Sequence, residues 1–235
     1  MTNQKTWPQK SGPRPPQRPQ HGRISPNQQG LDTLMKFHGV ELNKEAIEKL
    51  WAYHCLVREN NEDGDLTRLR AFETMVERHY VDCTIINGFM PEWPTRMLDI
   101  GSGAGFPGIP LKIVNPEIKL TLCEPRPKRV EFLNMVIQKL ELKNIDVFGH
   151  KATSNSLIEP VDGIITRAFE VMDKTLLRID KALKPGGCAV FMKGPAVKDE
   201  LAVFNHPEYT VEAENFYTIP NSTQERALVI LRRKK

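Results

Sequence analysis

The chain has 235 residues, enough for one large domain with an appendage or for two modest domains. Hydrophobic residues make up 40% and charged residues 26%, an ordinary composition for a globular chain with a buried core. No run of roughly 18 apolar residues is present, which argues against a membrane-spanning helix. No apolar stretch follows the basic N-terminus, so a secretory signal is not indicated.

The cysteine pattern points to a reducing compartment. Cys55, Cys83, Cys123 and Cys188 lie far apart, form no Cys-x-x-Cys pair and have no cluster of histidines beside them. This spacing argues against a structural zinc site or any other metal centre, and it suits free thiols in the cytosol. We therefore expect a cytoplasmic protein without a metal.

The net charge of +4 is located in the N-terminal tail. Residues 1–31 hold five basic and no acidic residues, whereas the remainder has 28 basic against 29 acidic residues. Global charge is therefore a weak argument for nucleic-acid binding, which must rest on local patches.

Residues 1–30 form a Pro/Gln/Arg-rich tail that we expect to be disordered. Six prolines and six glutamines fall within residues 1–29, so little apolar area is available to offset the entropy of ordering. The tail is interpreted either as a solubilising extension or as a basic arm that gathers phosphate contacts.

Residues 31–90 are predicted to form a helical N-terminal region. Two apolar stripes at helical spacing are Ile47, Leu50, Trp51, His54 and Cys55, then Phe72, Met75, Val76, His79, Tyr80 and Cys83. Turn-forming residues 60–65 separate them. His79 lies on the second stripe and is better read as a core histidine, whereas Arg78 lies off it and is expected to pair with Asp82 at i+4.

After Pro94 the pattern alternates between strands and helices up to residue 235. Strands are predicted at 97–100, 118–123, 145–148, 163–165, 188–192, 209–216 and 227–231, with helices at 109–114, from Pro127 to Leu140, and at 176–183. This order predicts an α/β fold with a doubly wound, Rossmann-like, largely parallel sheet over residues 91–235. No long helix separates the last two strands, so their connection is predicted to be antiparallel.

The strongest local signal is the glycine loop that follows the first strand. Gly101, Gly103 and Gly105 stand after Asp99, at a strand-to-helix turn where backbone can approach a ligand closely. A dinucleotide fingerprint would need a small residue where Phe106 stands, and Pro107 removes a backbone donor. The spacing instead favours S-adenosylmethionine, with a tight structural turn as the alternative.

Two carboxylates accompany this loop. Glu124 closes the second strand and can accept both hydroxyls of a ribose, or be a solvated strand-end acid. Asp99 can orient the loop, reach an ammonium group of the ligand, or cap local amides.

Longer motifs carry a resemblance to a known family. The run Leu98–Leu111, with its Phe-Pro-Gly-Ile-Pro-Leu continuation, resembles the bacterial 16S rRNA guanine-N7 methyltransferases of the RsmG type, also called glucose-inhibited division protein B. Further matches fall at residues 128–133, 166–169, 183–187 and 193–194, and the upstream segments 65–67 and 78–82 look like the helical region of the family. The resemblance covers residues 31–235.

The resemblance implies a class I S-adenosylmethionine-dependent methyltransferase fold with an N-terminal helical cap. It implies methylation of guanine N7 in 16S ribosomal RNA and cofactor contacts at Gly101, Phe106, Ala152, Thr153 and Arg167. Where the family has Asp-Ser after its second strand, this chain has Glu124-Pro125, which preserves the ribose role. Where the family has an arginine and an acid near the adenine, this chain reads Lys151-Ala152-Thr153, so backbone contacts can persist there but a contact between a carboxylate and the adenine cannot.

The acceptor decides the kind of catalysis. Guanine N7 carries a neutral lone pair and loses no proton, so no general base is required and catalysis is mainly positioning. Arg167 and Lys193 are the candidates for that role. The candidates for RNA contacts are Arg126, Lys128, Arg129 and Lys193, each with a solvated surface charge as the alternative.

Two other functions remain open at this point. One is methyl transfer to a non-RNA acceptor, and the other is a ribosome-associated binding module without turnover. In the favoured reading, the partner is 16S ribosomal RNA or the small ribosomal subunit, and the protein acts as a monomer. The terminal run 232–235 is expected to be a solvated end.

Overall fold

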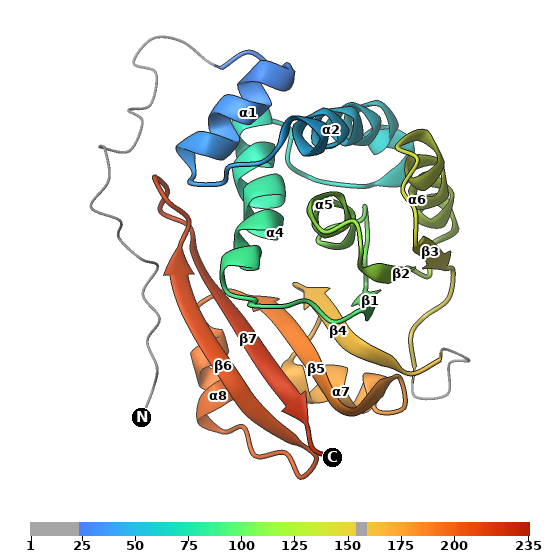
Figure 1. Ribbon diagram of the computed structural model, residues 1–235, viewed down its shortest axis with the longest axis vertical. Coiled ribbons are helices and arrows are strands. Elements are labelled where there is room, and N and C mark those ends of the chain that lie inside the picture. The colour runs from blue at the N-terminus through green and yellow to red at the C-terminus, as the bar shows by residue number, and fades with distance from the viewer. Residues whose placement is uncertain (1–23, 154–158) are drawn as a thin grey trace.

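The computed structural model describes residues 24–153 and 159–235. Within them, a seven-stranded sheet has the order β3-β2-β1-β4-β5-β7-β6 (Figure 1). Strands β1 to β5 pair in parallel, whereas β7 pairs antiparallel with both β5 and β6. The predicted α/β fold with a late antiparallel pair is thereby confirmed.

The strands and their connecting helices follow the predicted order. The strands are β1 (Arg96–Ile100), β2 (Lys119–Cys123), β3 (Ile145–Phe148), β4 (Val161–Arg167), β5 (Leu183–Lys193), β6 (Tyr209–Thr218) and β7 (Glu225–Arg233). The helices between them are α5 (Gly108–Val114), α6 (Pro127–Lys139), α7 (Met172–Ile179) and α8 (Val197–Ala202). Pro127 opens α6, as expected for a residue without an N–H to satisfy.

The helical region precedes the sheet. It consists of α1 (Gln28–Phe37), α2 (Lys44–Gly64) and a nearly continuous helix made of α3 (Phe72–Met75), the π-helical η1 (Val76–Val81), α4 (Asp82–Ile85) and the 3-10 turn η2 (Ile86–Gly88). Helix α1 starts before the predicted boundary at residue 31, because the Asn27 side chain caps it by accepting from the Gly30 N–H. Most of the predicted disordered tail, residues 1–23, lies outside the described residues.

Two local predictions are wrong. Residues 60–65 continue α2 as far as Gly64, and the chain turns only at Asp65, which adopts φ 45°. One of these side chains stabilises the segment that follows the helix, since the Asn61 side chain accepts from the Thr67 N–H. The predicted helix at 176–183 ends at Ile179, because Leu183 joins the sheet opposite Val161.

Helices cover both faces of the sheet (Figure 1). Alternate strand residues supply the two cores. Met97 and Val190 belong to the core shared with the N-terminal helices, α5 and α6. Leu98 and Phe191 point the other way, into the core formed with α7 and α8. The helical region therefore shares one continuous core with the sheet, and Arg78 and Asp82 of this region contact Arg167 at the carboxyl end of β4.

Candidate functional site

A pocket of about 450 Å³ opens at the carboxyl ends of β1, β4 and β5. Ligand sites of open α/β sheets lie at this edge. The residues that line the pocket are Leu66, Arg78, His79, Asp82, Gly101, Ser102, Gly103, Ala104, Phe106, Arg167, Ala168, Met192, Lys193, Gly194, Tyr217 and Arg226. Among the predicted site residues, the pocket brings together Gly101, Gly103, Phe106, Arg167 and Lys193.

The glycine loop forms one wall of this pocket. Gly101, Gly103 and Gly105 have φ values of 74°, 59° and 102°, a backbone region that favours glycine. A Cβ on Gly103 would lie in ordinary van der Waals contact, 3.8 Å from Arg129 Nη1, so Gly103 is favoured there by its backbone conformation and not by lack of room. A Cβ on Gly105 would lie 2.5 Å from the Ile109 side chain, so Gly105 permits close packing of the loop on α5.

Asp99 lies behind the loop and is fully buried. Its Oδ2 accepts from the Gly108 N–H at 3.1 Å, whereas Oδ1 is buried without a partner among the described residues. Burial raises the pKa of this carboxyl group to about 7. Of the three predicted roles, this placement favours the capping of a local amide, that of Gly108 at the start of α5, because the buried carboxylate does not line the pocket.

Glu124 also supports the loop from the end of β2. Its Oε2 accepts from the Gly103 N–H and its Oε1 from the Arg126 N–H, each at 2.9 Å, and the residue is 4% exposed. The alternative of a solvated strand-end acid is therefore wrong. Each carboxylate oxygen has a second lone pair, so binding of a ribose remains compatible with these contacts.

The predicted adenine contacts lie outside the pocket. Ala152 is buried in the core on the α7 side of the sheet, and Thr153 is exposed. Both follow β3, two strands away from β1 in the sheet order. Residues 154–158, which follow directly, are not among those described.

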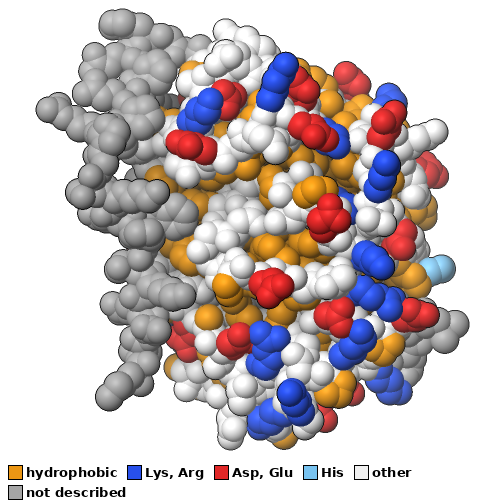
Figure 2. All heavy atoms as spheres, in the orientation of Figure 1, with side chains coloured by type: hydrophobic (Ala, Val, Ile, Leu, Met, Phe, Trp, Pro, Cys, Tyr) orange, Lys and Arg blue, Asp and Glu red, His pale blue; other side chains and the backbone are white. Residues whose placement is uncertain are grey.

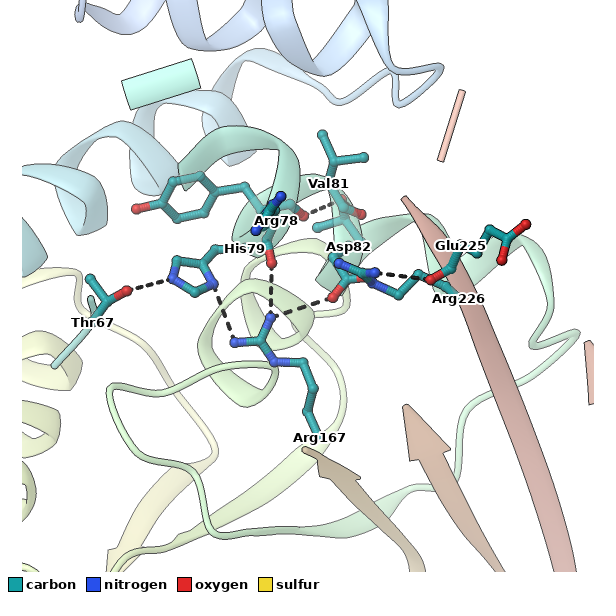
Figure 3. A network of polar contacts seen from close by, with 10 residues as sticks. Thr67, Arg78, His79, Val81, Asp82, Arg167, Glu225 and Arg226 are labelled. Atoms are coloured by element: carbon teal, nitrogen blue, oxygen red, sulfur yellow. Dashed lines mark hydrogen bonds and ion pairs between the residues drawn. The ribbon is translucent and has the colours of Figure 1, made fainter. Parts of the chain in front are cut away.

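Arg167, at the end of β4, is the hub of the opposite wall (Figure 3). Its Nη1 donates to the Arg78 carbonyl at 3.0 Å and lies 3.4 Å from Asp82 Oδ2. Its Nη2 lies 3.3 Å from His79 Nδ1. Asp82 also accepts from Arg226 Nε at 2.9 Å. The predicted ion pair of Arg78 with Asp82 is therefore wrong, because Asp82 pairs with Arg167 and Arg226 instead.

His79 is held in one tautomer by its neighbours. Because the Arg167 guanidinium can only donate, Nδ1 accepts, and the proton stays on Nε2, which donates to Thr67 Oγ1 at 2.8 Å. Burial and the adjacent Arg167 lower the pKa of His79 to about 3. The neutral ring stacks on Phe106 with centroids 4.2 Å apart, so His79 is packed and hydrogen-bonded, yet it also lines the pocket.

The four basic residues predicted to contact RNA differ in whether their side chains are already engaged in ion pairs. The Arg129 guanidinium donates to the Asp65 carbonyl, and both Arg126 and Arg129 form ion pairs with the Asp65 side chain. Lys193 pairs with Glu200 at 3.1 Å. Lys128 is exposed and has no ion pair within the described part of the chain. Basic and acidic side chains are interspersed on the face shown in Figure 2, so that face offers no single-sign patch.

Sequence reasoning missed several residues of this site. Asp82, Tyr217 and Arg226 line the pocket from the helical region, β6 and β7. Tyr53 of α2 supports the loop from behind, since its hydroxyl donates to the Ala104 carbonyl at 2.6 Å. The only signal for any of them was the family-like segment 78–82, which contains Asp82.

Within residues 24–153 and 159–235, no group of three or more His, Cys, Asp or Glu side chains could hold a metal ion. In the same residues, no helix is long and apolar enough to cross a membrane.

Comparison with solved structures defines the class of fold. The structure of yhhF from Escherichia coli, named as a methyltransferase, matches with a TM-score of 0.51 at 15% identity, over 66% of this chain and 86% of that one. Together with the sheet order and the antiparallel β7, this likeness identifies a class I methyltransferase fold. The family model described as GidB, rRNA small subunit methyltransferase G, matches residues 46–229. The chain belongs to this family.

Individual relatives agree with this assignment. Ribosomal RNA small subunit methyltransferase G of Pseudomonas putida (strain GB-1) is 36% identical over 204 residues, which are 87% of this chain and 94% of that protein. Ribosomal RNA small subunit methyltransferase G 2 of Syntrophobacter fumaroxidans is 38% identical over 212 residues. The match covers 89% of this chain but 42% of that relative, so the chain spans less than half of its length.

Proposed function

We propose that this protein transfers the methyl group of S-adenosylmethionine to N7 of a guanine in 16S ribosomal RNA. The observation that carries the proposal is the pocket between the glycine loop and Arg167, in a chain that belongs to the rRNA small subunit methyltransferase G family. The proposal extends to a monomer that acts in the cytoplasm.

The residues present fit such a cofactor. Gly103 lines the pocket, and Glu124, which accepts from the Gly103 N–H, has further lone pairs for ribose hydroxyls. Gly101 and Phe106 line the same pocket, whereas Ala152 and Thr153, which follow β3, are not among its lining residues. When bound, S-adenosylmethionine supplies an electrophilic methyl group.

The chemistry then requires orientation and little else. The N7 lone pair attacks without losing a proton, so a general base is unnecessary. The single histidine that lines the pocket in the described residues, His79, is kept neutral and is engaged on both ring nitrogens. Arg167 is left as the positioning residue, because its guanidinium is fixed by three partners on one side of the pocket.

Lys193 is a weaker candidate for positioning the base. Its ammonium group donates to the Glu170 carbonyl and to Glu200, which ties it to the start of α7 and to α8. For RNA contacts, Lys128 and Arg126 are favoured over Arg129 because they are the more exposed, and phosphate contacts need accessible charge.

Deletion of the gene tests the proposal. The deletion strain should lose one N7-methylguanine from 16S rRNA by mass analysis, and the wild-type gene should restore it, whereas Arg167→Ala should not. Retention of every N7-methylguanine would favour the alternative of a non-RNA acceptor. Purified protein that binds rRNA but transfers no methyl group to any acceptor would favour the binding module.

A further inference from the structure

Phe169 is an exposed aromatic residue beside the pocket that the mechanism above does not use. It follows β4 by two residues, after Ala168, whose φ of 49° turns the chain. The ring lies against the glycine loop, since a Cβ on Gly101 would be 2.6 Å from Phe169 Cδ2. Even so, 37% of the residue remains accessible. The ring therefore lies at the rim of the pocket, next to its first glycine.

The orientation of this ring is fixed by its neighbours. The Arg178 guanidinium lies over the ring, 5.6 Å from the centroid. Arg178 is held in turn by Glu170 through two hydrogen bonds of 2.6 and 3.2 Å. The Glu170 carbonyl accepts from Lys193 at 2.7 Å, which connects this cluster to the lining of the pocket. The ring is thus held in place by Arg178 on one face, and a stacked purine would use the other face.

We propose that Phe169 is the stacking platform for the acceptor guanine, an inference that rests on the proposed function. A base in rRNA must leave its own stack before an enzyme can modify it, and such bases are held by stacking on aromatic side chains. Stacking fixes the plane of the purine while leaving N7 on its edge, free to point toward the pocket. Phe169 is placed for this because it adjoins Gly101, in the loop where the methyl donor would lie.

The chain offers a matched control. Phe216 is 40% exposed and also carries a cation over its ring, Lys198 at 4.9 Å. It precedes Tyr217, which lines the pocket, so Phe216 points to the opposite face of the sheet. Truncation of Phe216 removes a similar exposed ring without touching the site.

The test compares methyl transfer to 16S rRNA by the wild type, Phe169→Ala, Phe169→Tyr and Phe216→Ala. Loss of one base stack should lower kcat/KM for RNA by about 10- to 100-fold in Phe169→Ala. Phe169→Tyr and Phe216→Ala should stay near the wild type, and calorimetry should give an unchanged Kd for S-adenosylhomocysteine in all four. Weakened binding of that ligand in Phe169→Ala, with full activity at saturating cofactor, would assign the ring to the cofactor and overturn the proposal. Wild-type kcat/KM in Phe169→Ala would also overturn it.

Two further variants distinguish a loss of stacking from a loss of folding, and a failure of this proposal from a failure of the proposed function. Should Phe169→Ala fail to fold by circular dichroism, Phe169→Leu keeps the apolar bulk without the aromatic face, and full activity in it would refute stacking. In Phe169→Trp, guanine-containing RNA should quench the added fluorescence relative to the wild type. Failure of the wild type to methylate rRNA would refute the proposed function, whereas absence of quenching with an active enzyme would refute only the platform.

Discussion

Asp82 and Arg167 lie 85 residues apart in the chain, yet Asp82 Oδ2 is 3.4 Å from Arg167 Nη1. Asp82 belongs to the helical region and Arg167 ends β4, so their contact joins the N-terminal helices to the edge of the sheet at the pocket (Figure 3). The same carboxylate, 6% exposed in its side chain, also accepts from Arg226 of β7. One buried acid thereby positions two basic residues of the site.

Removal of this acid should destabilise the fold. Asp82→Ala leaves two guanidinium groups without their carboxylate in a buried setting, and such a loss costs about 3–5 kcal/mol. Urea unfolding measures this change. Asp65→Asn is the control, because asparagine tolerates the φ of 45° at this position, the Asp65 side chain is 78% exposed, and its ion pairs should be worth less than about 1 kcal/mol. Equal losses in the two variants would contradict the assigned role of Asp82.

Substitution of Arg167 should reduce catalysis while the protein stays folded. In Arg167→Ala, Asp82 keeps its contact with Arg226, so the buried acid is still paired. Loss of the positioning group should lower kcat by about 100-fold, since small misplacements of the reacting groups have effects of that size. Arg167→Lys should not restore activity, because an ammonium group cannot reproduce the forked geometry toward Arg78, Asp82 and His79. A fully active Arg167→Ala variant would remove Arg167 from the mechanism.

The strands and the glycine loop can be predicted from the sequence, whereas the contacts around Arg167 cannot. Strands and glycine loop follow from local patterns, and β3 at Ile145–Phe148 was predicted residue for residue. The site depends in addition on long-range packing. His79 could be placed on an apolar stripe, but its contact with Arg167 exists only because the helix over residues 72–88 packs beside β4. Leu183 shows the same effect of long-range packing. Its spacing predicts a helix, but in the structure it pairs with Val161 in the sheet.

Glu124 should matter for cofactor binding as well as for folding. Glu124→Ala removes a charged acceptor from the Gly103 and Arg126 amides, interactions worth about 1.5–3 kcal/mol each. We expect at least a tenfold rise in the Kd for S-adenosylhomocysteine, about 1.4 kcal/mol, measured by titration calorimetry. Asp146→Ala, at an exposed position of β3, should leave this Kd unchanged. Unaltered binding in Glu124→Ala would show that the acid has no part in the cofactor site.

Protonation of His79 should weaken the fold in mild acid. Its pKa is lowered from an ordinary 6.5 to about 3, so its contribution to stability is complete above pH 6.5 and is lost as the pH falls toward 3. The Tm of the wild type should therefore fall more steeply between pH 6.5 and 4 than that of His79→Gln, which cannot take up the proton. Since burial also lowers the pKa of His54, to about 4, the variant should retain part of the decline. Parallel Tm curves would mean that His79 is not held neutral.

The most direct measurement is methyl transfer in vitro. Purified protein, labelled S-adenosylmethionine and small ribosomal subunits or their extracted 16S rRNA would be combined, and the labelled nucleotide mapped at base resolution. We expect label at a single guanine, on N7, that disappears with Arg167→Ala. Label on another atom or another class of molecule, or no transfer by protein that binds the cofactor, would contradict it.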